Sequence, residues 1–213
     1  TLPWLDRAWG SPDVAFVEPL ARRRLGRLAR SAFHVAARVV PPQGCRLVFA
    51  SQHGDGDRAA AMMTDVAQGL DLSPTAFAVS VHNAVPGQWS LLRQDRSPSS
   101  ALAAGPDTLA LGLVEAWLAW RRSPETPVLC VYAEDRLPEL FRGFSAHDPE
   151  PCAAAFLLSR EARTTLGLAR EEAPRDPDPR TSLAEAALEA LAVGHNLTWT
   201  GAQGTWTLQV ESP

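Results

Sequence analysis

The chain has 213 residues, of which 46% are hydrophobic and 21% are charged. This balance is typical of a globular domain rather than a disordered chain, and the length suits a single hydrophobic core. The net charge is −4, and all 20 basic residues are arginine, which argues against nucleic acid as a partner because nonspecific binding needs a basic face.

The sequence also argues against a membrane span, a disulfide framework and a metal site. No apolar run approaches the roughly 20 residues that cross a bilayer, and the amino terminus lacks the pattern of a signal peptide. Cys45, Cys130 and Cys152 are widely spaced and form no C-x-x-C pattern, so they predict neither disulfides nor a zinc site. We therefore expect reduced thiols, no cofactor and a cytoplasmic location.

The amino-terminal half alternates helix and strand patterns. Apolar residues at helical spacing between arginines predict an amphipathic helix over residues 16–40. Residues 45–51 predict a buried strand that runs into a polar turn. A helical pattern follows over residues 58–70, and Ser73 before Pro74 predicts the cap of another helix. This order of elements favours an α/β fold.

The middle of the chain continues this pattern. Residues 101–122 predict a long apolar helix that begins near Pro106 and Asp107. Residues 127–135 are apolar almost to their end, which predicts a strand buried on both faces. Residues 153–160 predict a further strand, although three alanines leave a helix open.

The carboxyl-terminal part is less regular. We expect a mobile loop over residues 167–181, whose second half concentrates proline and charge. Residues 182–213 predict a helix, capped by Ser182 and Glu185, followed by a terminal hairpin. Residues 1–213 are treated as a single domain.

One stretch, SVHNAVPGQWS over residues 80–90, suggests chemistry. With His82 as base, Ser80 or Ser90 as nucleophile and Asp95 as the orienting group, it would form a hydrolase-like triad. No G-x-S-x-G elbow is present to expose a serine at a turn. A structural role for His82 is the alternative.

Other candidates have simpler explanations. Asp55 and Asp57 would bind a cation only with further oxygen ligands, so a polar turn is favoured. The NLT triplet at residues 196–198 fits a glycosylation acceptor, but such matches are frequent. Four tryptophans would form a ligand platform or, more commonly, buried anchors: Trp117, Trp120, Trp199 and Trp206.

Four segments in order resemble the β-ketoacyl-synthase-like chain-length-factor family, in the short form of bacterial aryl-polyene and xanthomonadin-type pigment clusters. They are VFASQHGD (48–55), LSPTAFAVSVHNAVPGQWSLL (72–92), SSALAAGPDTLALGLVEA (99–116) and PVLCVYAEDRLPELFRGF (127–144). The resemblance extends from about residue 16 to residue 160. It implies an α/β thiolase-like (ketosynthase-like) fold, as a half or reduced form, with a central mixed β-sheet flanked by helices.

The resemblance also implies where a partner binds. Dimers of that family are built across the segment that residues 80–90 occupy here, so His82 would shape a partner surface rather than attack a substrate. The implied partner interface consists of Ser80, Val81, His82, Asn83, Gly87, Gln88 and Trp89.

The nucleophile of the family is missing. An active ketosynthase carries a cysteine at the amino end of a buried helix, and counting back from Gly112 puts Ala104 at that position. Alanine has no group that can take an acyl chain, whereas a thiolate would be favoured at a helix start. The chain is also expected to lack the second thiolase half with its paired catalytic histidines. The resemblance therefore implies no catalytic residue.

The implied function is a noncatalytic subunit that pairs with an active ketosynthase and helps to wall the tunnel of the growing chain. Bulky side chains would limit chain length by volume, and the candidates are Met62, Met63, Phe77, Trp89 and Leu109. An acyl carrier protein is a transient partner, with Arg22, Arg23, Arg24 and Arg27 as a candidate contact or a solvated helix face. The alternatives are a stand-alone acyl-thioester hydrolase or transferase that uses Ser80 or Ser90 with His82, and an inactive carrier-binding scaffold.

Overall fold

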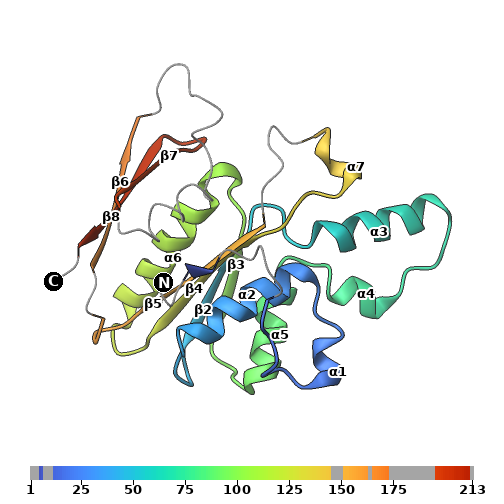
Figure 1. The fold of residues 1–213 in the computed structure, drawn as a ribbon, viewed down its shortest axis with the longest axis horizontal. Helices are drawn as coiled ribbons and strands as arrows, with labels where there is room; N and C mark the ends of the chain where they lie inside the picture. The colour runs from blue at the N-terminus through green and yellow to red at the C-terminus, as the bar shows by residue number, and fades with distance from the viewer. Residues whose placement is uncertain (1–4, 7–11, 145–150, 163–164, 173–194, 212–213) are drawn as a thin grey trace.

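The computed structural model describes residues 5–6, 12–144, 151–162, 165–172 and 195–211, and Figure 1 shows their arrangement. The larger sheet has the strand order β1-β5-β4-β2-β3. Its members are β1 (Leu5–Asp6), β2 (Arg46–Ala50), β3 (Ser99–Leu102), β4 (Val128–Glu134) and β5 (Cys152–Leu158).

The centre of this sheet is parallel. β2 pairs in parallel with β3 on one side and β4 on the other, whereas β5 runs antiparallel to β4. Every residue of β4 is buried, as the apolar run of residues 127–135 predicts. The strands expected over residues 45–51 and 153–160 are also confirmed, so the sheet is mixed.

Helices cover both faces of the sheet. α2 (Arg27–Arg38) and α5 (Ala84–Arg93) contact one face, and α6 (Thr108–Arg122) packs on the other. A Cβ on Gly112 would lie 2.8 Å from the Ala50 Cβ, so this glycine lets α6 approach β2 closely. The sheet therefore separates two apolar cores.

The single helix predicted over residues 16–40 is wrong. It is divided into α1 (Pro19–Arg22) and α2 by a break in which Gly26 has an extended backbone and stands as the N-cap. Leu25 and Leu28 are buried, as the apolar spacing predicts, but Leu20 is exposed. The sequence pattern therefore predicts helix on both sides of Gly26 but misses the break between the two helices.

Helices α3 (Gly56–Ala67) and α4 (Pro74–Ala78) form an arm that projects from the body at the right of Figure 1. Ser73 caps α4 by accepting a hydrogen bond from the Ala76 N–H, as predicted. None of the residues of α3 or α4 is buried. We refer to residues 56–78 as the arm.

A second, antiparallel sheet has the order β6-β8-β7. It consists of β6 (Thr165–Glu171), β7 (Leu197–Thr200) and β8 (Thr205–Glu211), and the last two form the predicted terminal hairpin. The loop expected over residues 167–181 is wrong for residues 167–171, which pair with β8. The rest of that loop and the helix expected after residue 182 lie outside the described residues, apart from residue 172.

Two short elements complete the fold, the 3-10 turn η1 (Gly105–Asp107) before α6 and helix α7 (Glu139–Arg142) after β4. Trp199, Trp206 and Leu208 of the second sheet join the core on the α6 side. In the described part of the chain, no helix is long and apolar enough to cross a membrane.

Candidate functional site

Three of the segments that suggested a function meet where the parallel strands end. Ser51 and His53 follow β2, Ala104 follows β3, and Glu134 is the last residue of β4. In open α/β sheets, ligands bind outside the carboxyl ends of the parallel strands. This edge of the sheet is therefore the candidate functional site.

Glu134 holds the turn after β2. Its side chain is only 2% exposed, and its carboxylate accepts a hydrogen bond from the Gln52 backbone N–H. The His53 Nδ1 lies 3.3 Å from the other Glu134 oxygen. A buried carboxylate is stable only with such partners, so Glu134 fixes the position of residues 52 and 53 at the site. Sequence reasoning missed this residue, although an acid at the end of an apolar strand was the available signal.

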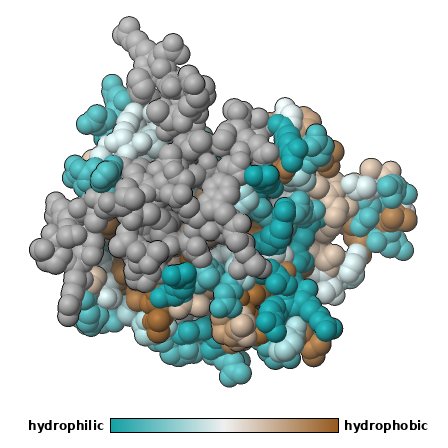
Figure 2. All heavy atoms as spheres, viewed as in Figure 1, coloured by the Kyte–Doolittle hydropathy of each residue, from teal (hydrophilic) through white to brown (hydrophobic). Residues whose placement is uncertain are grey.

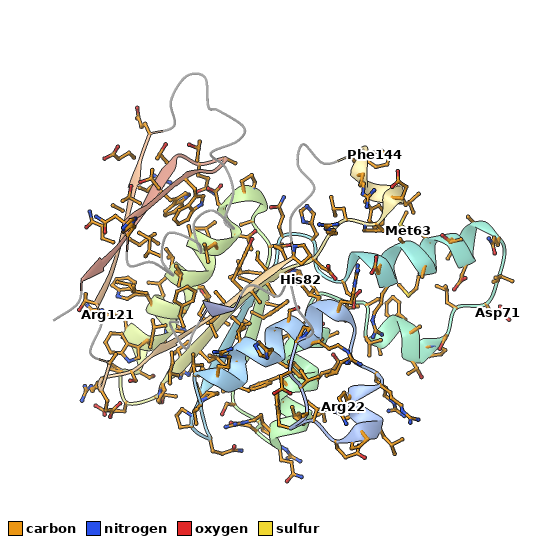
Figure 3. The ribbon with its side chains drawn as sticks, viewed as in Figure 1. Arg22, Met63, Asp71, His82, Arg121 and Phe144 are labelled. Atoms are coloured by element: carbon orange, nitrogen blue, oxygen red, sulfur yellow. The ribbon has the colours of Figure 1, made fainter. Side chains whose placement is uncertain are left out.

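His82 is engaged by the backbone rather than by a serine. Its Nε2 donates to the Ser51 carbonyl oxygen at 2.8 Å, and its ring packs edge-on against Phe49 at a centroid distance of 5.8 Å. The Nδ1 atom is buried and has no hydrogen-bond partner among the described residues. Figure 3 shows His82 near the centre of the molecule, between the sheet and the arm.

The Ser/His triad does not form. The Ser80 hydroxyl donates to the Phe77 carbonyl oxygen at 2.8 Å, and the Ser90 hydroxyl donates to the Asp95 carbonyl oxygen. The Asp95 carboxylate accepts bonds from Ser97, whose hydroxyl holds the Asp95 pKa below its usual range. Each member thus bonds to other groups in this structure, and neither Ser80 nor Ser90 is joined to His82 by a hydrogen bond among the described contacts.

Ala104 lies just before η1, at the start of the segment that leads into α6. Its side chain is a methyl group, and its backbone N–H donates to the Thr108 hydroxyl oxygen at 2.9 Å. Gly105, the next residue, has a left-handed φ of 57°, which glycine adopts without strain. The position expected for a nucleophile therefore has no reactive side chain, and its amide is already used.

Asp107 links this turn to the terminal hairpin. Its carboxylate accepts a bond from the Trp206 indole Nε1–H at 2.6 Å and another from the Gln203 backbone N–H at 3.1 Å. Asp107 is 1% exposed. A Cβ on Gly201 would overlap its carboxylate, so the hairpin needs glycine there. The sequence indicated Asp107 only as an acid in a first helical turn.

The predicted partner interface is divided between surface and core. Val81, Asn83 and Gly87 are exposed, and Ser80, His82 and Gln88 are half-buried. Trp89 is only 8% exposed and packs edge-on against Phe33 of α2 at 5.1 Å. α5 thus directs this side chain into the core.

The predicted tunnel residues also differ in exposure. Met62 is half-buried, while Met63 and Phe77 on the arm are 56% and 55% exposed. Figure 3 places Met63 on the arm. Leu109 is enclosed by the core beside the sheet and contributes no surface, and buried Trp89 contributes almost none. Of the predicted tunnel residues, the two that are exposed, Met63 and Phe77, therefore both lie on the arm.

The two aspartates of the polar turn bind arginines. Asp55 accepts a hydrogen bond from the Arg58 backbone N–H and pairs with the Arg58 guanidinium at 2.9 Å. Asp57 pairs with Arg27 at 2.8 Å, and Arg27 also contacts Asp135 at 3.1 Å. In the described ranges, no three His, Cys, Asp or Glu residues are grouped to hold a metal ion. These contacts anchor the base of the arm, while Arg23 and Arg24 are exposed.

The tryptophans have unequal roles. Trp199 and Trp206 stack at a centroid distance of 6.4 Å inside the core, which supports the interpretation as buried anchors. Trp120 packs partly buried against the same core, and Trp117 is exposed with Arg121 over its ring at 5.5 Å. They do not form one platform.

The three thiols are buried or half-buried. Burial raises the pKa of Cys45 to about 11 and that of Cys130 to about 12, and Cys152 is buried in β5. A thiol is a weak nucleophile unless it is ionised. Neither Cys45 nor Cys130 therefore replaces the missing cysteine.

This fold and site define a chain of the ketosynthase type. A family model, the N-terminal domain of β-ketoacyl synthase, matches residues 3–212. The chain therefore belongs to this family. No curated protein matches it.

Solved structures agree on the fold. A ketosynthase (ApeO) in complex with its chain length factor (ApeC), from Xenorhabdus doucetiae, is similar with a TM-score of 0.79 and 24% identity, over 98% of this chain and 88% of that chain. A β-ketoacyl synthase from Burkholderia phymatum is similar with a TM-score of 0.59 and 13% identity, over 86% of this chain and 57% of that chain. The ishigamide ketosynthase/chain length factor has a TM-score of 0.56 and 15% identity, over 82% of this chain and 57% of that chain. The thiolase-like α/β fold is thus confirmed, and the chain spans little more than half of the last two matched chains.

Proposed function

We propose that this chain is a noncatalytic subunit, like a chain-length factor, that pairs with an active β-ketoacyl synthase. In this role it helps to shape the tunnel of a growing acyl or polyene chain in aryl-polyene-type biosynthesis. The observation that carries the proposal is the turn at residue 104, because it combines the position of the family's nucleophile with a methyl side chain.

The surface of the arm supports a partner role. Met63, Val66, Leu70 and Phe77 are each more than half exposed, and Figure 2 shows apolar side chains at this end of the molecule. Helices of this length are marginal in water without packing, and clustered apolar surface usually marks an interface. Val81 and Asn83, which lie between α4 and α5 in the chain, are also exposed.

The edge strand β3 supports the same role. It ends the larger sheet, and no described strand pairs with its outer side. An unpaired strand edge is a template for a strand of another chain. Because β3 leads directly to Ala104, a partner bound there would lie beside the vacant nucleophile position.

The proposal assigns separate surfaces to the acyl chain and the carrier protein. Met62, Met63 and Phe77 are the candidates for the tunnel wall, since long apolar side chains would limit its volume. Exposed Arg23 and Arg24 are candidates for an acidic carrier protein. An inactive carrier-binding scaffold is the second candidate, and the exposed arginines favour it.

Reconstitution tests the proposal. The chain is co-expressed with a β-ketoacyl synthase of the same organism, and the complex is isolated by size-exclusion chromatography and assayed for condensation with carrier-bound malonyl. We expect a stable heterodimer whose activity is lost when the partner's cysteine is replaced and persists in His82→Ala and Ser90→Ala. No complex, or turnover of an acyl thioester by this chain alone, would contradict the proposal.

A further inference from the structure

The Thr108 side chain occupies the centre of the turn at residue 104. Its hydroxyl oxygen accepts a hydrogen bond from the Ala104 backbone N–H at 2.9 Å and donates to the Gly105 carbonyl oxygen at 2.6 Å. Thr108 is 1% exposed. The hydroxyl thus closes a small ring of contacts over the residue that stands at the nucleophile position.

This arrangement removes a group that acyl transfer needs. When a nucleophile attacks a thioester, the carbonyl oxygen becomes an oxyanion that must accept hydrogen bonds from positioned donors. The backbone N–H of the nucleophilic residue itself is a natural donor at the start of a helix. At residue 104 that N–H points to the Thr108 oxygen instead.

We propose that Thr108 is a second barrier to catalysis, independent of the missing cysteine, because its hydroxyl masks the amide of residue 104. The inference rests on the proposed noncatalytic function and deepens it. It predicts that restoring a cysteine at residue 104 does not by itself restore acyl transfer, whereas also removing the Thr108 hydroxyl frees the donor.

The step to be measured is acyl transfer from a small thioester to the thiol that Ala104→Cys introduces. The introduced thiolate attacks the carbonyl carbon and forms a new carbon–sulfur bond as the bond to the departing thiol breaks. The departing thiolate takes up the proton that the introduced thiol released. The step therefore needs no oxidant or further reactant.

Three variants separate the two barriers: Ala104→Cys alone, Ala104→Cys with Thr108→Val, and Ala104→Cys with Thr108→Ser. Valine keeps the branched shape without the hydroxyl, and serine keeps the hydroxyl. Each isolated protein is incubated with an acetyl thioester of N-acetylcysteamine, and acylation is followed by intact-protein mass spectrometry. We expect the acylation rate to be about tenfold or more higher with valine at residue 108 than with threonine or serine there. One oxyanion donor contributes at least this factor to the rate of acyl transfer.

Alkylation by iodoacetamide is the matched control. That reaction forms no oxyanion, so all three variants should be alkylated at residue 104 at rates within about twofold of one another if only the donor differs. The unaltered chain provides the background, which should be low because burial raises the pKa of Cys45 to about 11 and of Cys130 to about 12. Thermal melts confirm folding, and Thr108→Ala replaces Thr108→Val if the latter does not fold.

The outcomes are distinct. Faster acylation of the variant with Thr108→Val, together with equal alkylation of all three variants, supports the proposal that the Thr108 hydroxyl masks the N–H of residue 104. Equal acylation of the threonine and valine variants, including no acylation of either, overturns it. Because this assay uses the chain alone, overturning the mask leaves the heterodimer test of the proposed function unaffected.

Discussion

The body of the molecule and its arm have opposite relations between sequence pattern and burial. In the body, apolar residues of α2 are buried against one face of β4, and the other face of β4 is buried in the core on the α6 side. In the arm, α3 and α4 have apolar residues of the same kinds, yet none of them is buried. Since α2 is a helix like α3 and α4, helix propensity does not explain the difference in burial. This difference in burial supports the proposal that the arm packs against a partner subunit.

The largest expected effect is in the body. Phe49→Ala removes a side chain that is 1% exposed and packs between the sheet, α2 and His82. Such a cavity should lower the free energy of unfolding by about 3–5 kcal/mol. Urea denaturation of the isolated chain measures it, and a loss comparable to that of an arm variant would remove the distinction between the two regions.

The next effect concerns the link between the body and the terminal hairpin. Asp107→Asn places an amide group at one of the two positions that receive hydrogen bonds from Trp206 and Gln203. We expect a loss of about 1.5–3 kcal/mol in the free energy of unfolding, with a change in tryptophan fluorescence. The exposed Asp71→Asn at the end of the arm is the control and should be neutral. If both variants unfold alike, Asp107 is not the anchor of the hairpin.

The arm should respond in binding rather than in stability. Val66→Ser combined with Phe77→Ser should change the free energy of unfolding of the isolated chain by less than about 0.5 kcal/mol per site. It should weaken binding to the ketosynthase at least tenfold, or about 1.4 kcal/mol. Leu118→Ser, an exposed leucine on α6 of the body, is the matched control. Isothermal titration calorimetry compares the affinities of the arm variant and the Leu118→Ser variant for the ketosynthase. If the two affinities are equal, the interface does not include the arm.

The smallest expected effect is the pH dependence of the free energy of unfolding that Asp95 contributes. Asp95 has a lowered pKa because the Ser97 hydroxyl, the Ser97 N–H and the Gly44 N–H donate to its carboxylate. A carboxyl group with a lowered folded-state pKa stabilises the protein above the unfolded-state pKa, and this stabilisation is lost as pH falls through the folded-state pKa. The stability gap between the wild type and Asp95→Asn should therefore narrow below about pH 4, as measured by urea denaturation. A gap that stays constant with pH would show that the charge of Asp95 does not matter.

The elements predicted well are those in which local pattern and tertiary burial agree. β2 and β4 are continuous apolar runs between turn residues, and the terminal hairpin alternates around glycines. α5 was not predicted, because Pro86 and Gly87 interrupt its pattern. Pro86 is the third residue of α5, where the backbone N–H has no partner within the helix, so proline is tolerated there. β3 was missed because three of its four residues are Ser or Ala, which give no strand signal.

The site was predictable only in part. The resemblance pointed to Ala104 and to the segment around His82, and the structure places both near the ends of the parallel strands. Two contacts depend on the η1 turn: the hydrogen bond between the Ala104 N–H and the Thr108 hydroxyl, and the hydrogen bond between the Trp206 indole and Asp107. The spacing of apolar residues in the sequence does not predict such a turn. The sequence placed Trp89 on a surface, whereas the structure buries it. Its burial depends on the direction of α5, and this helix was not predicted.

Hydrogen–deuterium exchange of the chain, alone and with the β-ketoacyl synthase, distinguishes an arm that packs on a partner from one that packs within this chain. We expect fast exchange of the arm, residues 56–78, in the isolated chain and marked protection in the complex, with β4 protected in both. Strong protection of the arm in the isolated chain, unchanged when the synthase is added, would contradict the account.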